Sequence, residues 1–517
     1  MMAVHFFEAG LRRTLLITLL LVVSGCASVP FDYPKTASHS PPPGPNTVTG
    51  EAALRWQADH GSVNGFVGLP EGIDALGVRL RMMQLAEKSI DAQYFILKND
   101  RAGALFAGKM LLAADRGVKV RLLLDDVFTT GIDRQLSLLN SHPNIEVRLF
   151  NPLSRRSLKY WSYLLDFSRA NRRMHNKSFT VDNSMTIVGG RNIGEEYFEL
   201  KQDVMFDDYE VFAIGAVVGD VSAGFDQFWN SELAVPVEAF GIKVDPGELN
   251  DWREYMRVKT HESATGVYAQ ALDSKMLRNI RDGRLRPALA EATMVTDSPD
   301  KLLNPVGDKN GAALRNDIGE RFRDAKHEIL IITPYFIPQE AGTKLIEQLL
   351  AKGVRVVIVT NSLASTNHVA VHSGYARYRK RLIRAGAEIH EIRAEFSGDE
   401  TGWGHSPELV TLHSKSTVID RKTIFVGSLN FDPRSILINT EMGLFIESSD
   451  LGAVFTVKLF QSLPRTTYRV DLDEHDQLRW TYQYDGQQEI LHKEPQAAWS
   501  RRFMAGFYGI LPIEGQL

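Results

Sequence analysis

Two stretches of this sequence match: His175-Asn176-Lys177-Ser178-Phe179-Thr180-Val181-Asp182 and His413-Ser414-Lys415-Ser416-Thr417-Val418-Ile419-Asp420. The first is followed by Gly-Gly-Arg-Asn at 189–192, and the second by Gly-Ser-Leu-Asn at 427–430. The histidine, lysine, aspartate and asparagine of the two copies recur at one constant offset along the chain. Agreement of four polar positions in both residue type and spacing indicates an internal duplication.

Each copy predicts a β-hairpin. Asp182-Asn183 and Asp420-Arg421 lie between two runs rich in β-branched residues, as the turn of a hairpin would. Alternate side chains of a strand face the same way, so His175 and Lys177 are expected on one side. The hairpin register brings Arg191 opposite His175.

The polar groups of each copy are therefore expected to converge. The converging side chains are His175, Lys177 and Asn192 in the first copy, and His413, Lys415 and Asn430 in the second. A tetrahedral phosphate needs such a set, because a cation balances its charge, an amide binds an oxygen and an imidazole attacks or protonates. Two unrelated surface hairpins are the alternative, and a dinucleotide-binding loop at 189–194 lacks the required glycine spacing.

The pattern H-x-K-x4-D-x6-G-[GS]-x-N resembles the phospholipase D superfamily, whose members carry one such motif in each half. The resemblance implies an α/β fold of two pseudo-symmetric α/β/α sandwich halves that share one active site. It implies that His175 is the nucleophile and His413 the general acid and base. It also implies that Lys177, Lys415, Asn192 and Asn430 hold the phosphate oxygens.

Four carboxylates belong to the two motifs. Glu441 and Asp208 follow the two hairpins at corresponding places, and in the superfamily an acid there hydrogen-bonds the histidine ring and fixes its tautomer. Surface carboxylates at strand starts are the alternative. Asp182 and Asp420 lie in the predicted turns and are expected to be structural.

The duplication extends beyond the motifs and predicts the domain organisation. Residues 86–96 correspond to 325–337, and 116–124 correspond to 352–359, each within a pattern of helix, strand, helix, glycine turn and strand. We expect an N-terminal half at 51–240, a connector at 241–310 and a C-terminal half at 311–465. Residues 466–517 are expected to form a strand meander with an apolar tail.

The start of the chain predicts a lipoprotein. Arg12-Arg13 precede a short apolar run, and Val23-Ser24-Gly25-Cys26 looks like a bacterial lipobox, so 1–26 is expected to be a signal peptide with Cys26 as the lipidation site. Cys26 is the only cysteine. Residues 27–50 are rich in proline and serine and are expected to be an unfolded tether. An ordinary cleaved signal, or a cytosolic start with a chance cysteine, is the alternative.

These features predict a membrane-anchored protein of the bacterial cell envelope that faces the periplasm. Ala27 follows the cysteine where an aspartate commonly retains lipoproteins in the inner membrane, so the outer membrane is expected. The formal net charge of −4 argues against a broad nucleic-acid-binding surface. No nucleic-acid partner, cofactor or metal is expected, and the oligomeric state is not predicted.

Several further segments permit two interpretations. Asp125-Asp126 suit a helix N-cap better than a metal site, because no cysteine or histidine cluster accompanies them. The basic and aromatic stretch at 154–173 suits either a lipid interface or a helix packed on the core. The apolar segment 503–513 either packs on the domain or enters a membrane. Residues that resemble the family's approach to the second-half site, and are expected to bind substrate, are His372, Tyr375 and Arg434.

The second motif continues as Gly-Ser-x-Asn-x-Asp-Pro-Arg-Ser at 427–435, which resembles the bacterial cardiolipin synthases, and the first-half motif resembles their C type. The resemblance implies phosphatidyl transfer through a phosphohistidine, with phosphatidylglycerol as acceptor and phosphatidylglycerol or phosphatidylethanolamine as donor. A phospholipase D that hydrolyses headgroups would use the same residues. A phosphodiesterase or nuclease, and a lipid-binding lipoprotein with a relic site, are the remaining alternatives.

Overall fold

The helices and strands of the first half lie before residue 240. The computed structural model describes residues 29–129, 131–155, 163, 166–200, 204–262, 266–395 and 409–517. Its first elements are α2 (Val48–His60), β1 (Asn64–Leu69), α3 (Gly72–Leu85), β2 (Ser89–Tyr94), α4 (Arg101–Asp115), β3 (Lys119–Asp125), α5 (Asp133–Asn140), β4 (Ile145–Phe150) and α7 (Phe167–Ala170). Next come β5 (Ser178–Val181), β6 (Met185–Gly189), β7 (Val204–Asp207), β8 (Glu210–Ile214), α8 (Val217–Trp229) and β9 (Ala234–Pro236).

The second half repeats this order after three intervening helices. Those helices are α9 (Pro246–Glu262), α10 (Val267–Leu272) and α11 (Lys275–Arg281). The second half contains β10 (Ala288–Thr296), α12 (Ala313–Asp324), β11 (Glu328–Ile332), α13 (Gln339–Ala351), β12 (Arg355–Asn361), α14 (Val369–Ala385), β13 (Glu388–Ile392), β14 (Leu409–Leu412), β15 (Ser416–Ile419), β16 (Thr423–Gly427), β17 (Met442–Glu447) and α15 (Ser449–Thr466). The chain ends with β18 (Thr467–Leu472), β19 (Leu478–Tyr484), β20 (Gln487–Leu491) and α16 (Trp499–Ile510).

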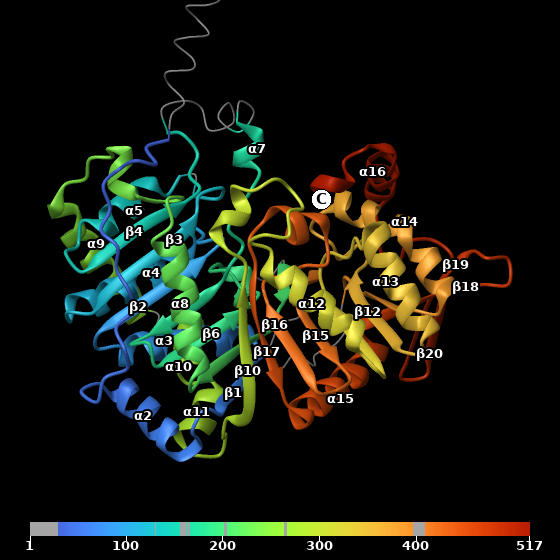
Figure 1. Cartoon of the computed structure of the whole chain (residues 1–517), viewed down its shortest axis with the longest axis horizontal. Coiled ribbons are helices and arrows are strands. Elements are labelled where there is room, and N and C mark those ends of the chain that lie inside the picture. Colours follow the sequence, from blue (N-terminus) through green and yellow to red (C-terminus); the bar gives the residue numbers. More distant parts are fainter. Residues whose placement is uncertain are drawn as a thin grey trace, which may run out of the picture.

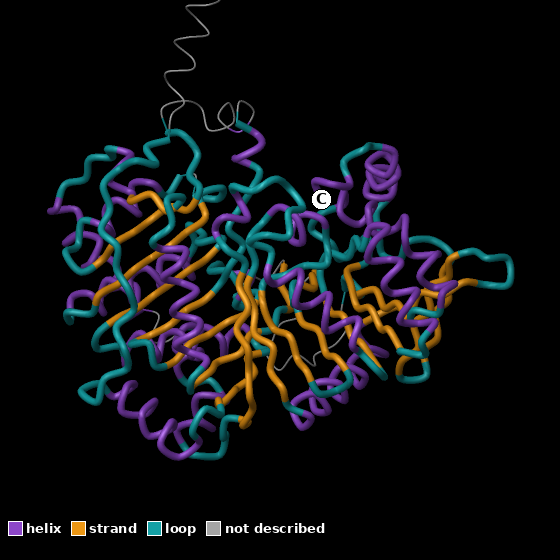
Figure 2. Tube along the Cα trace, viewed as in Figure 1, coloured by secondary structure: helices purple, strands orange, loops and turns teal. Residues whose placement is uncertain are grey.

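One mixed sheet runs through both halves (Figures 1 and 2). Its strand order is β9-β4-β3-β2-β5-β6-β8-β1-β10-β17-β16-β15-β11-β12-β13-β18-β19-β20. The order is symmetric about the β1–β10 pair, because β4-β3-β2-β5-β6-β8 on one side matches β13-β12-β11-β15-β16-β17 on the other. The prediction of two pseudo-symmetric α/β halves is confirmed.

Helices cover the sheet on both faces, as the continuous apolar strands predict. Leu122 and Leu124 of β3 pack in one cluster with α3 and α4, whereas Leu123 between them packs with α8. In the second half, α12, α13 and α14 occupy the place of α3, α4 and α5, and α15 occupies the place of α8. Strands such as β3 therefore bury both of their faces, which fixes their position and that of the loops that follow them.

The predicted hairpins are present. In β5 and β6, Ser178 pairs with Val188 and Val181 with Met185, and β15 and β16 pair in the same way. The turn residues Asp182, Asn183, Asp420 and Arg421 all have φ near +50°. Two consecutive residues with positive φ make the tight turn whose twist matches that of the flanking strands.

The expectation of an unfolded tether at 27–50 is wrong for the described part of that segment. Residues 30–47 run extended along the first half, and α2 begins at Val48. Lys35 Nζ donates to the carbonyls of Ser231 and Ala234 at 2.7 and 2.8 Å, and Ser38 accepts from Trp229 Nε1 at 3.0 Å. Proline and serine favour an extended backbone, but composition cannot show that this backbone meets polar partners on the folded domain.

The segment at 241–310 is more regular than the predicted connector. Helices α9 and α10 pack on α4 and α3 of the first half. Strand β10 pairs with β1 and β17 at the centre of the sheet, so the second half starts before residue 311. Strands β18 to β20 pair in succession as a meander, and β18 joins this meander to the same sheet through β13. These roles depend on pairing with distant strands, which local periodicity does not reveal.

Candidate active site

The motif aspartates hold the hairpins to the sheet. Asp182 accepts hydrogen bonds from the backbone N–H of Ser89 and Lys88 at 2.8 Å and of Glu87 at 3.1 Å. In the second half Asp420 accepts from three successive N–H groups, those of Lys326, His327 and Glu328, at 2.7–2.9 Å. Both carboxylates thus bind the turn that enters the neighbouring strand, β2 or β11, which is the structural role predicted for them.

The backbone of each motif is bound to the opposite half. His175 N–H donates to the carbonyl of Thr440 at 2.9 Å, and Thr440 N–H donates to the carbonyl of Arg173 at 3.0 Å. His413 N–H donates to the carbonyl of Asp207 at 2.7 Å, at the end of the parallel pair β7–β14. Each histidine therefore enters the site beside the acid-bearing segment of the other half.

The two acids are exchanged between the halves. Glu441 accepts from His175 Nδ1 at 2.9 Å, and Asp208 accepts from His413 Nδ1 at 2.5 Å. Ser428 Oγ donates to the second-half carboxylate at 2.5 Å. A carboxylate on Nδ1 selects the tautomer whose Nε2 carries a free lone pair, as an attacking or proton-accepting imidazole requires.

Aromatic side chains enclose both imidazoles. The Phe95 ring meets His175 edge-on, with ring centroids 4.9 Å apart, and Phe206 stacks on His413 at 5.2 Å. Tyr197 also meets the second histidine edge-on at 5.3 Å. The sequence analysis did not select these residues, although Phe95 lies within the duplicated segment 86–96. Aromatic residues near a motif are more often core than site, so the pattern alone gave no reason to choose them.

The lysines and asparagines of the motifs lie buried beside the histidines. Lys177 Nζ donates to the carbonyl of His175 at 2.6 Å, and Lys415 Nζ lies 2.9 Å from His413 Nδ1. Asn192 Oδ1 accepts from Ile96 N–H at 3.1 Å. Asn430 Oδ1 is buried and has no hydrogen-bond partner among the described residues. The predicted set of imidazole, ammonium and carboxamide is therefore assembled around both rings.

Burial and like charge keep both imidazoles neutral. Burial, with the neighbouring Lys177 and Lys415, lowers the pKa of His175 well below its ordinary value. Burial and Lys415 lower the pKa of His413 to about 3. A neutral ring with Nδ1–H bound to a carboxylate has its Nε2 ready to accept a bond.

The charged partners are shifted by the same burial. Burial lowers the pKa of Lys177 to about 7 and that of Lys415 to about 8. Burial also raises the pKa of Glu441 to about 7. Burial opposes ionisation of Asp208 as well, but His413 and Lys415 outweigh it and hold the pKa of this acid below its usual value. Burial makes the charged form of both lysines less stable, and an anion bound between them would stabilise it.

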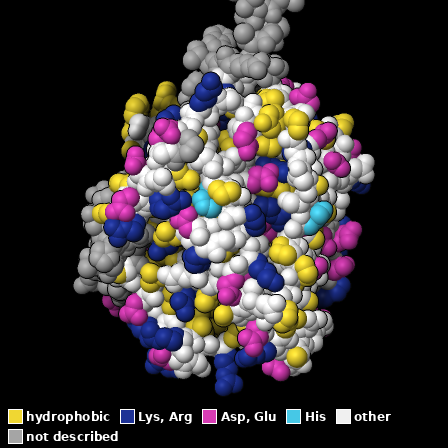
Figure 3. Space-filling model, turned by 90° about the vertical axis from the view of Figure 1, so that its left-hand side faces the viewer, with side chains coloured by type: hydrophobic (Ala, Val, Ile, Leu, Met, Phe, Trp, Pro, Cys, Tyr) yellow, Lys and Arg dark blue, Asp and Glu magenta, His cyan; other side chains and the backbone are white. Residues whose placement is uncertain are grey.

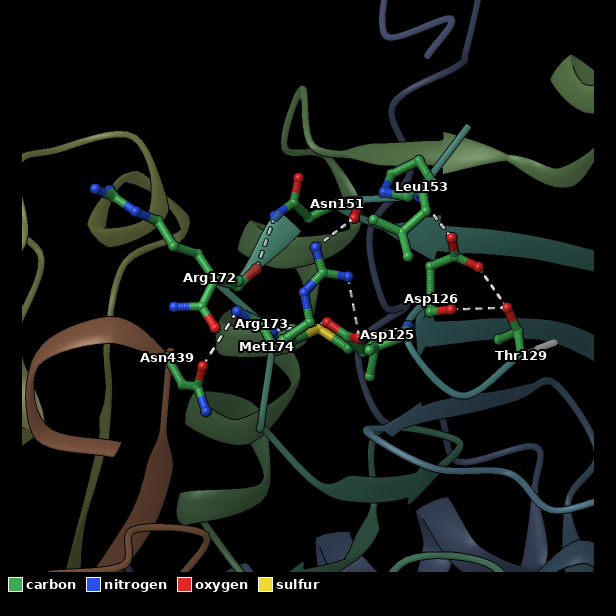
Figure 4. Close-up of polar contacts among 12 residues, drawn as sticks. Asp125, Asp126, Thr129, Asn151, Leu153, Arg172, Arg173, Met174 and Asn439 are labelled. Carbon is green, nitrogen blue, oxygen red and sulfur yellow. Dashed lines mark hydrogen bonds and ion pairs between the residues drawn. The ribbon is translucent and has the colours of Figure 1, made fainter. Parts of the chain in front are cut away.

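Asp125 and Asp126 do not cap a helix and instead bind the backbone and an arginine of neighbouring loops. Asp125 accepts from Met174 N–H at 2.9 Å and pairs with Arg173, while Asp126 accepts from Leu153 N–H at 2.6 Å (Figure 4). The pair braces the segment that enters His175. Within the described residues, no three histidine, cysteine, aspartate or glutamate side chains are grouped to hold a metal ion.

The three residues expected to bind substrate lie in different places. Arg434 donates to the Asn171 carbonyl at 2.9 Å and contributes to the low pKa of His175, so it lies at the edge of the site. Tyr375 is buried in the second-half core and donates to Glu391 at 2.9 Å, so its prediction is wrong. His372 lies one turn earlier on α14 and faces Glu494. Residues three apart share one face of a helix, and the rings of His372 and Tyr375 meet edge-on with centroids 5.5 Å apart, so these two lie together.

Arg191 also departs from its expected place. It lies in the predicted register, but its guanidinium is fully buried and donates to the carbonyls of Leu69, Pro70 and Asp208. It therefore supports the loop that carries Asp208 and does not point toward the imidazole of His175. Backbone register fixes the position of a residue, whereas the direction of a long side chain depends on its tertiary partners.

The described part of the basic and aromatic stretch makes internal contacts. Arg155 pairs with Asp126 and Asp133, and Arg169 pairs with Asp166. Arg172 donates to the carbonyls of Leu302 and Asn304. Residues 156–162, 164 and 165, which include Arg156, Lys159, Tyr160 and Trp161, lie outside the described residues. The described arginines support the packed-helix interpretation over a lipid-facing one.

Two further observations concern the molecular surface. Among the described residues, no helix is long and apolar enough to cross a bilayer. On the face of the first half drawn in Figure 3, Lys and Arg side chains are interspersed with Asp and Glu. Such mixed charge differs from the continuous basic surface that binds nucleic acid. The predicted signal peptide at 1–26 and its Cys26 lie outside the described residues.

Comparison with known proteins identifies the family. The family model described as "Cardiolipin synthase, PLD-like domain" matches residues 80–229 and 318–462. Cardiolipin synthase C of Escherichia coli strain K12 is 39% identical over 469 residues, covering 90% of this chain and 98% of that protein. An uncharacterized protein of Helicobacter pylori strain J99 is 31% identical over 477 residues, covering 90% of each chain.

A solved structure shows the same fold. The crystal structure of phosphatidylserine synthase from Haemophilus influenzae Rd KW20 superimposes with a TM-score of 0.56 at 14% identity, covering 90% of this chain and 100% of that one. At this identity the similarity concerns the fold alone. The family model and the relative from E. coli show, with the duplicated motifs, that this chain belongs to the phospholipase D-like family of the cardiolipin synthases.

Proposed function

We propose that this protein is a phosphatidyltransferase that makes cardiolipin, with phosphatidylglycerol as the acceptor. The observation that carries the proposal is the pair of interlocked sites, in which Glu441 binds His175 and Asp208 binds His413 across the halves. Two imidazoles with fixed tautomers suit a reaction in two displacements at phosphorus. The similarity to cardiolipin synthase C over 90% of the chain supports the choice of lipid.

In the first displacement, His175 Nε2 attacks the phosphorus of a phospholipid phosphodiester. The bond to the headgroup oxygen breaks, and His413 gives its proton to the leaving alkoxide. The phosphodiester anion offsets the repulsion from Lys177 and Lys415 that lowers the pKa of the second histidine. Binding of substrate thus favours the protonated ring that the general acid needs.

In the second displacement, the acceptor hydroxyl attacks the phosphatidyl-histidine. His413 now removes the hydroxyl proton, the phosphorus–nitrogen bond breaks, and His175 leaves as a neutral ring. Lys177, Lys415 and Asn192 bind the non-bridging oxygens and stabilise the extra charge of the pentacoordinate state. The same site hydrolyses phospholipid when water replaces the alcohol, so the acceptor decides between a synthase and a phospholipase D.

Product analysis tests the proposal. Purified protein is incubated with vesicles of phosphatidylglycerol, alone or with phosphatidylethanolamine, and the lipids are extracted and identified by mass spectrometry. Cardiolipin is expected, and isotope labels on either phospholipid reveal which one donates the phosphatidyl group. His175→Ala serves as the inactive control. Phosphatidic acid as the sole product would reject the synthase and establish the hydrolase.

We also propose that acylated Cys26 holds the enzyme on a membrane of the bacterial cell envelope, facing the periplasm. Because residues 30–47 are docked on the first half, only the few residues after Cys26 are left to connect the domain to the membrane. Phe31 lies beneath Arg169, with the guanidinium 5.3 Å from the ring centroid, so the chain docks beside α7. Only four residues lie between Cys26 and Phe31, and the five steps along the chain span about 17 Å when extended. An anchor this short supports a site that takes its substrate from the same membrane.

Fractionation tests the anchor. Cys26→Ala is expected to release the protein from washed membranes and to block processing of the signal peptide. Cys26→Ser keeps the size of the side chain but removes the thiol, and it is expected to give the same result. Separation of inner and outer membranes then tests the expectation of the outer membrane. Unslowed processing of the alanine variant, together with its retention in the membrane pellet after a high-salt wash, would reject the anchor.

A further inference from the structure

Helix α16, at the end of the chain, exposes its apolar side chains. Trp499, Phe503, Phe507 and Ile510 are 76%, 59%, 47% and 79% exposed. Their spacing of four, four and three residues places them on one face, which we call the aromatic stripe. Four large apolar side chains in water on one helix face are unusual for a soluble surface and typical of an interfacial helix.

The opposite side of α16 is bound to the domain. Arg501 donates to the carbonyl of Leu363 at 2.9 Å and also to that of Thr366. The helix packs on α14, and beyond it Leu517 accepts from the Arg434 backbone at 2.9 Å. The aromatic stripe therefore cannot turn inward without breaking these contacts. Its exposure is a property of the docked helix rather than of a loose end.

A cavity of about 620 Å³ lies beside the aromatic stripe, between α14, α16 and the β19–β20 hairpin. Five of its lining residues are permanent cations, namely Arg377, Arg379, Lys380, Lys493 and Arg502, and the only carboxylate in the lining is that of Glu494. On α16, Arg502 and Gly506 form the wall next to the stripe. Arg377 pairs with Glu514, and Arg379 pairs with Glu391 and Glu494, so the excess positive charge at the border of the apolar surface comes from Lys380, Lys493 and Arg502.

Two buried side chains in the lining have unused hydrogen-bonding atoms. His372 and Arg379 are each 3% exposed. Among the described residues, His372 Nδ1 and Arg379 Nε have no partner, although Nε2 of the histidine lies 3.5 Å from Glu494 and the guanidinium pairs with Glu391 and Glu494. A buried donor without a partner costs free energy, which an anionic oxygen that accepts from Arg379 Nε–H would recover.

We infer that this cavity binds the phosphate of an anionic phospholipid whose acyl chains lie along the aromatic stripe, with α16 in the bilayer interface. Arg502 and Lys493 meet the phosphate, while Trp499 and Phe503 meet the chains. The catalytic histidines do not line the cavity, so this is a second lipid site. It does not depend on the proposed reaction.

The placement also orients the enzyme. After α16, Gln516 accepts from Asn171 Nδ2 at 2.6 Å, four residues before His175. In Figure 1, α16, α7 and the C-terminus lie along the same edge of the molecule. A helix held in the interface therefore brings the edge of the active site toward the bilayer.

Fluorescence quenching tests the stripe. The full chain is bound to vesicles that contain brominated phosphatidylcholine and phosphatidylglycerol, and tryptophan quenching is compared with that of Trp499→Phe. We expect bromine to quench the emission of Trp499, so the wild-type chain should lose a larger fraction of its fluorescence than the variant does. Equal quenching of the two proteins would overturn the inference, because Trp499 would then lie outside the lipid.

Vesicle binding in a Cys26→Ala background, where the acyl anchor is absent, provides a second test of the stripe. Phe503→Ser with Phe507→Ser is expected to weaken binding about tenfold or more. Val454→Ser with Val457→Ser is the matched control, because these valines are also half exposed but lie on α15. The control is expected to bind within about twofold of the parent. Equal losses in the two pairs would overturn the role of the stripe.

The headgroup is tested by vesicles of phosphatidylcholine with and without phosphatidylglycerol. Lys493→Glu with Arg502→Glu is expected to abolish the preference for phosphatidylglycerol. Gly506→Leu is expected to do the same by occupying the cavity, and a Cβ added at this position meets no atom within 4 Å, so the fold is expected to be retained. An unchanged preference in both variants would overturn the inference. It would also be overturned if inorganic phosphate displaced the protein from phosphatidylglycerol vesicles as effectively as added phosphatidylglycerol does.

Discussion

Glu441 binds the imidazole of His175, although the two residues belong to opposite halves of the molecule. Asp208 and His413 make the reciprocal pair. Each half therefore holds a complete histidine, lysine and asparagine set but takes its orienting acid from the other half. The two halves must be docked for either imidazole to have a fixed tautomer. The sheet that continues across both halves holds them in that position.

Replacing either exchanged acid is expected to lower turnover without unfolding the protein. Glu441→Gln keeps the size of the side chain, but it no longer favours the Nδ1–H tautomer of His175. We expect kcat to fall by about 10²–10⁴-fold, and similarly for Asp208→Asn. Glu447→Gln is the control, since this residue lies on the same strand β17 but pairs with Arg321 at the surface. A loss in the control as large as in Glu441→Gln would contradict the assignment.

Removing either catalytic histidine is expected to abolish turnover, because attack and leaving-group protonation each need one ring. The losses in His175→Ala and His413→Ala should not add, since the two groups act as a unit. With a substrate that has a good leaving group, His413→Ala should still accumulate a phosphoenzyme, and His175→Ala should not. The opposite labelling pattern would exchange the two roles, and a far slower double variant would contradict a shared site.

The rate at low substrate concentration is expected to fall as pH rises. Burial lowers the pKa of Lys177 to about 7 and that of Lys415 to about 8, so these ammonium groups lose their protons above this range. The phosphodiester needs their charge, and therefore kcat/KM should decline above about pH 8, where Glu441, whose pKa burial raises to about 7, is already ionised. A bound anion raises both lysine pKa values, so kcat should decline only at higher pH. A kcat/KM that rises above about pH 8 would refute the assignment.

The two turn aspartates are expected to contribute unequally to stability. Asp182 is 2% exposed and accepts from three backbone N–H groups and from Thr49 Oγ1, whereas Asp420 binds N–H groups nearer the solvent. Water can replace the carboxylate at Asp420 more readily. We expect Asp182→Ala to lower the free energy of unfolding by about 2–4 kcal/mol and Asp420→Ala by about 1–2 kcal/mol. Urea unfolding measures both, and the reverse order would be inconsistent with this account.

The sequence alone determined the duplicated hairpins, because the residues that specify a hairpin lie close together in the chain. Alternation in a strand places His175 and Lys177 on one side, and the Asp182-Asn183 turn defines the register. The same reasoning assigned a structural role to Asp182 and Asp420. Repetition of helix, strand and glycine turn then indicated two α/β halves, because each half needs a second covered layer to bury its apolar strands.

Only the tertiary structure decided which groups meet across the halves. Glu441 and His175 are 266 residues apart, and no periodicity connects them. The same limit explains why Tyr375 lies in the core, why Arg191 binds carbonyls, why residues 30–47 are docked, and why α16 exposes its aromatic face. Spacing along the chain fixes the side from which a residue leaves its own element, whereas the packing of distant elements fixes what it meets.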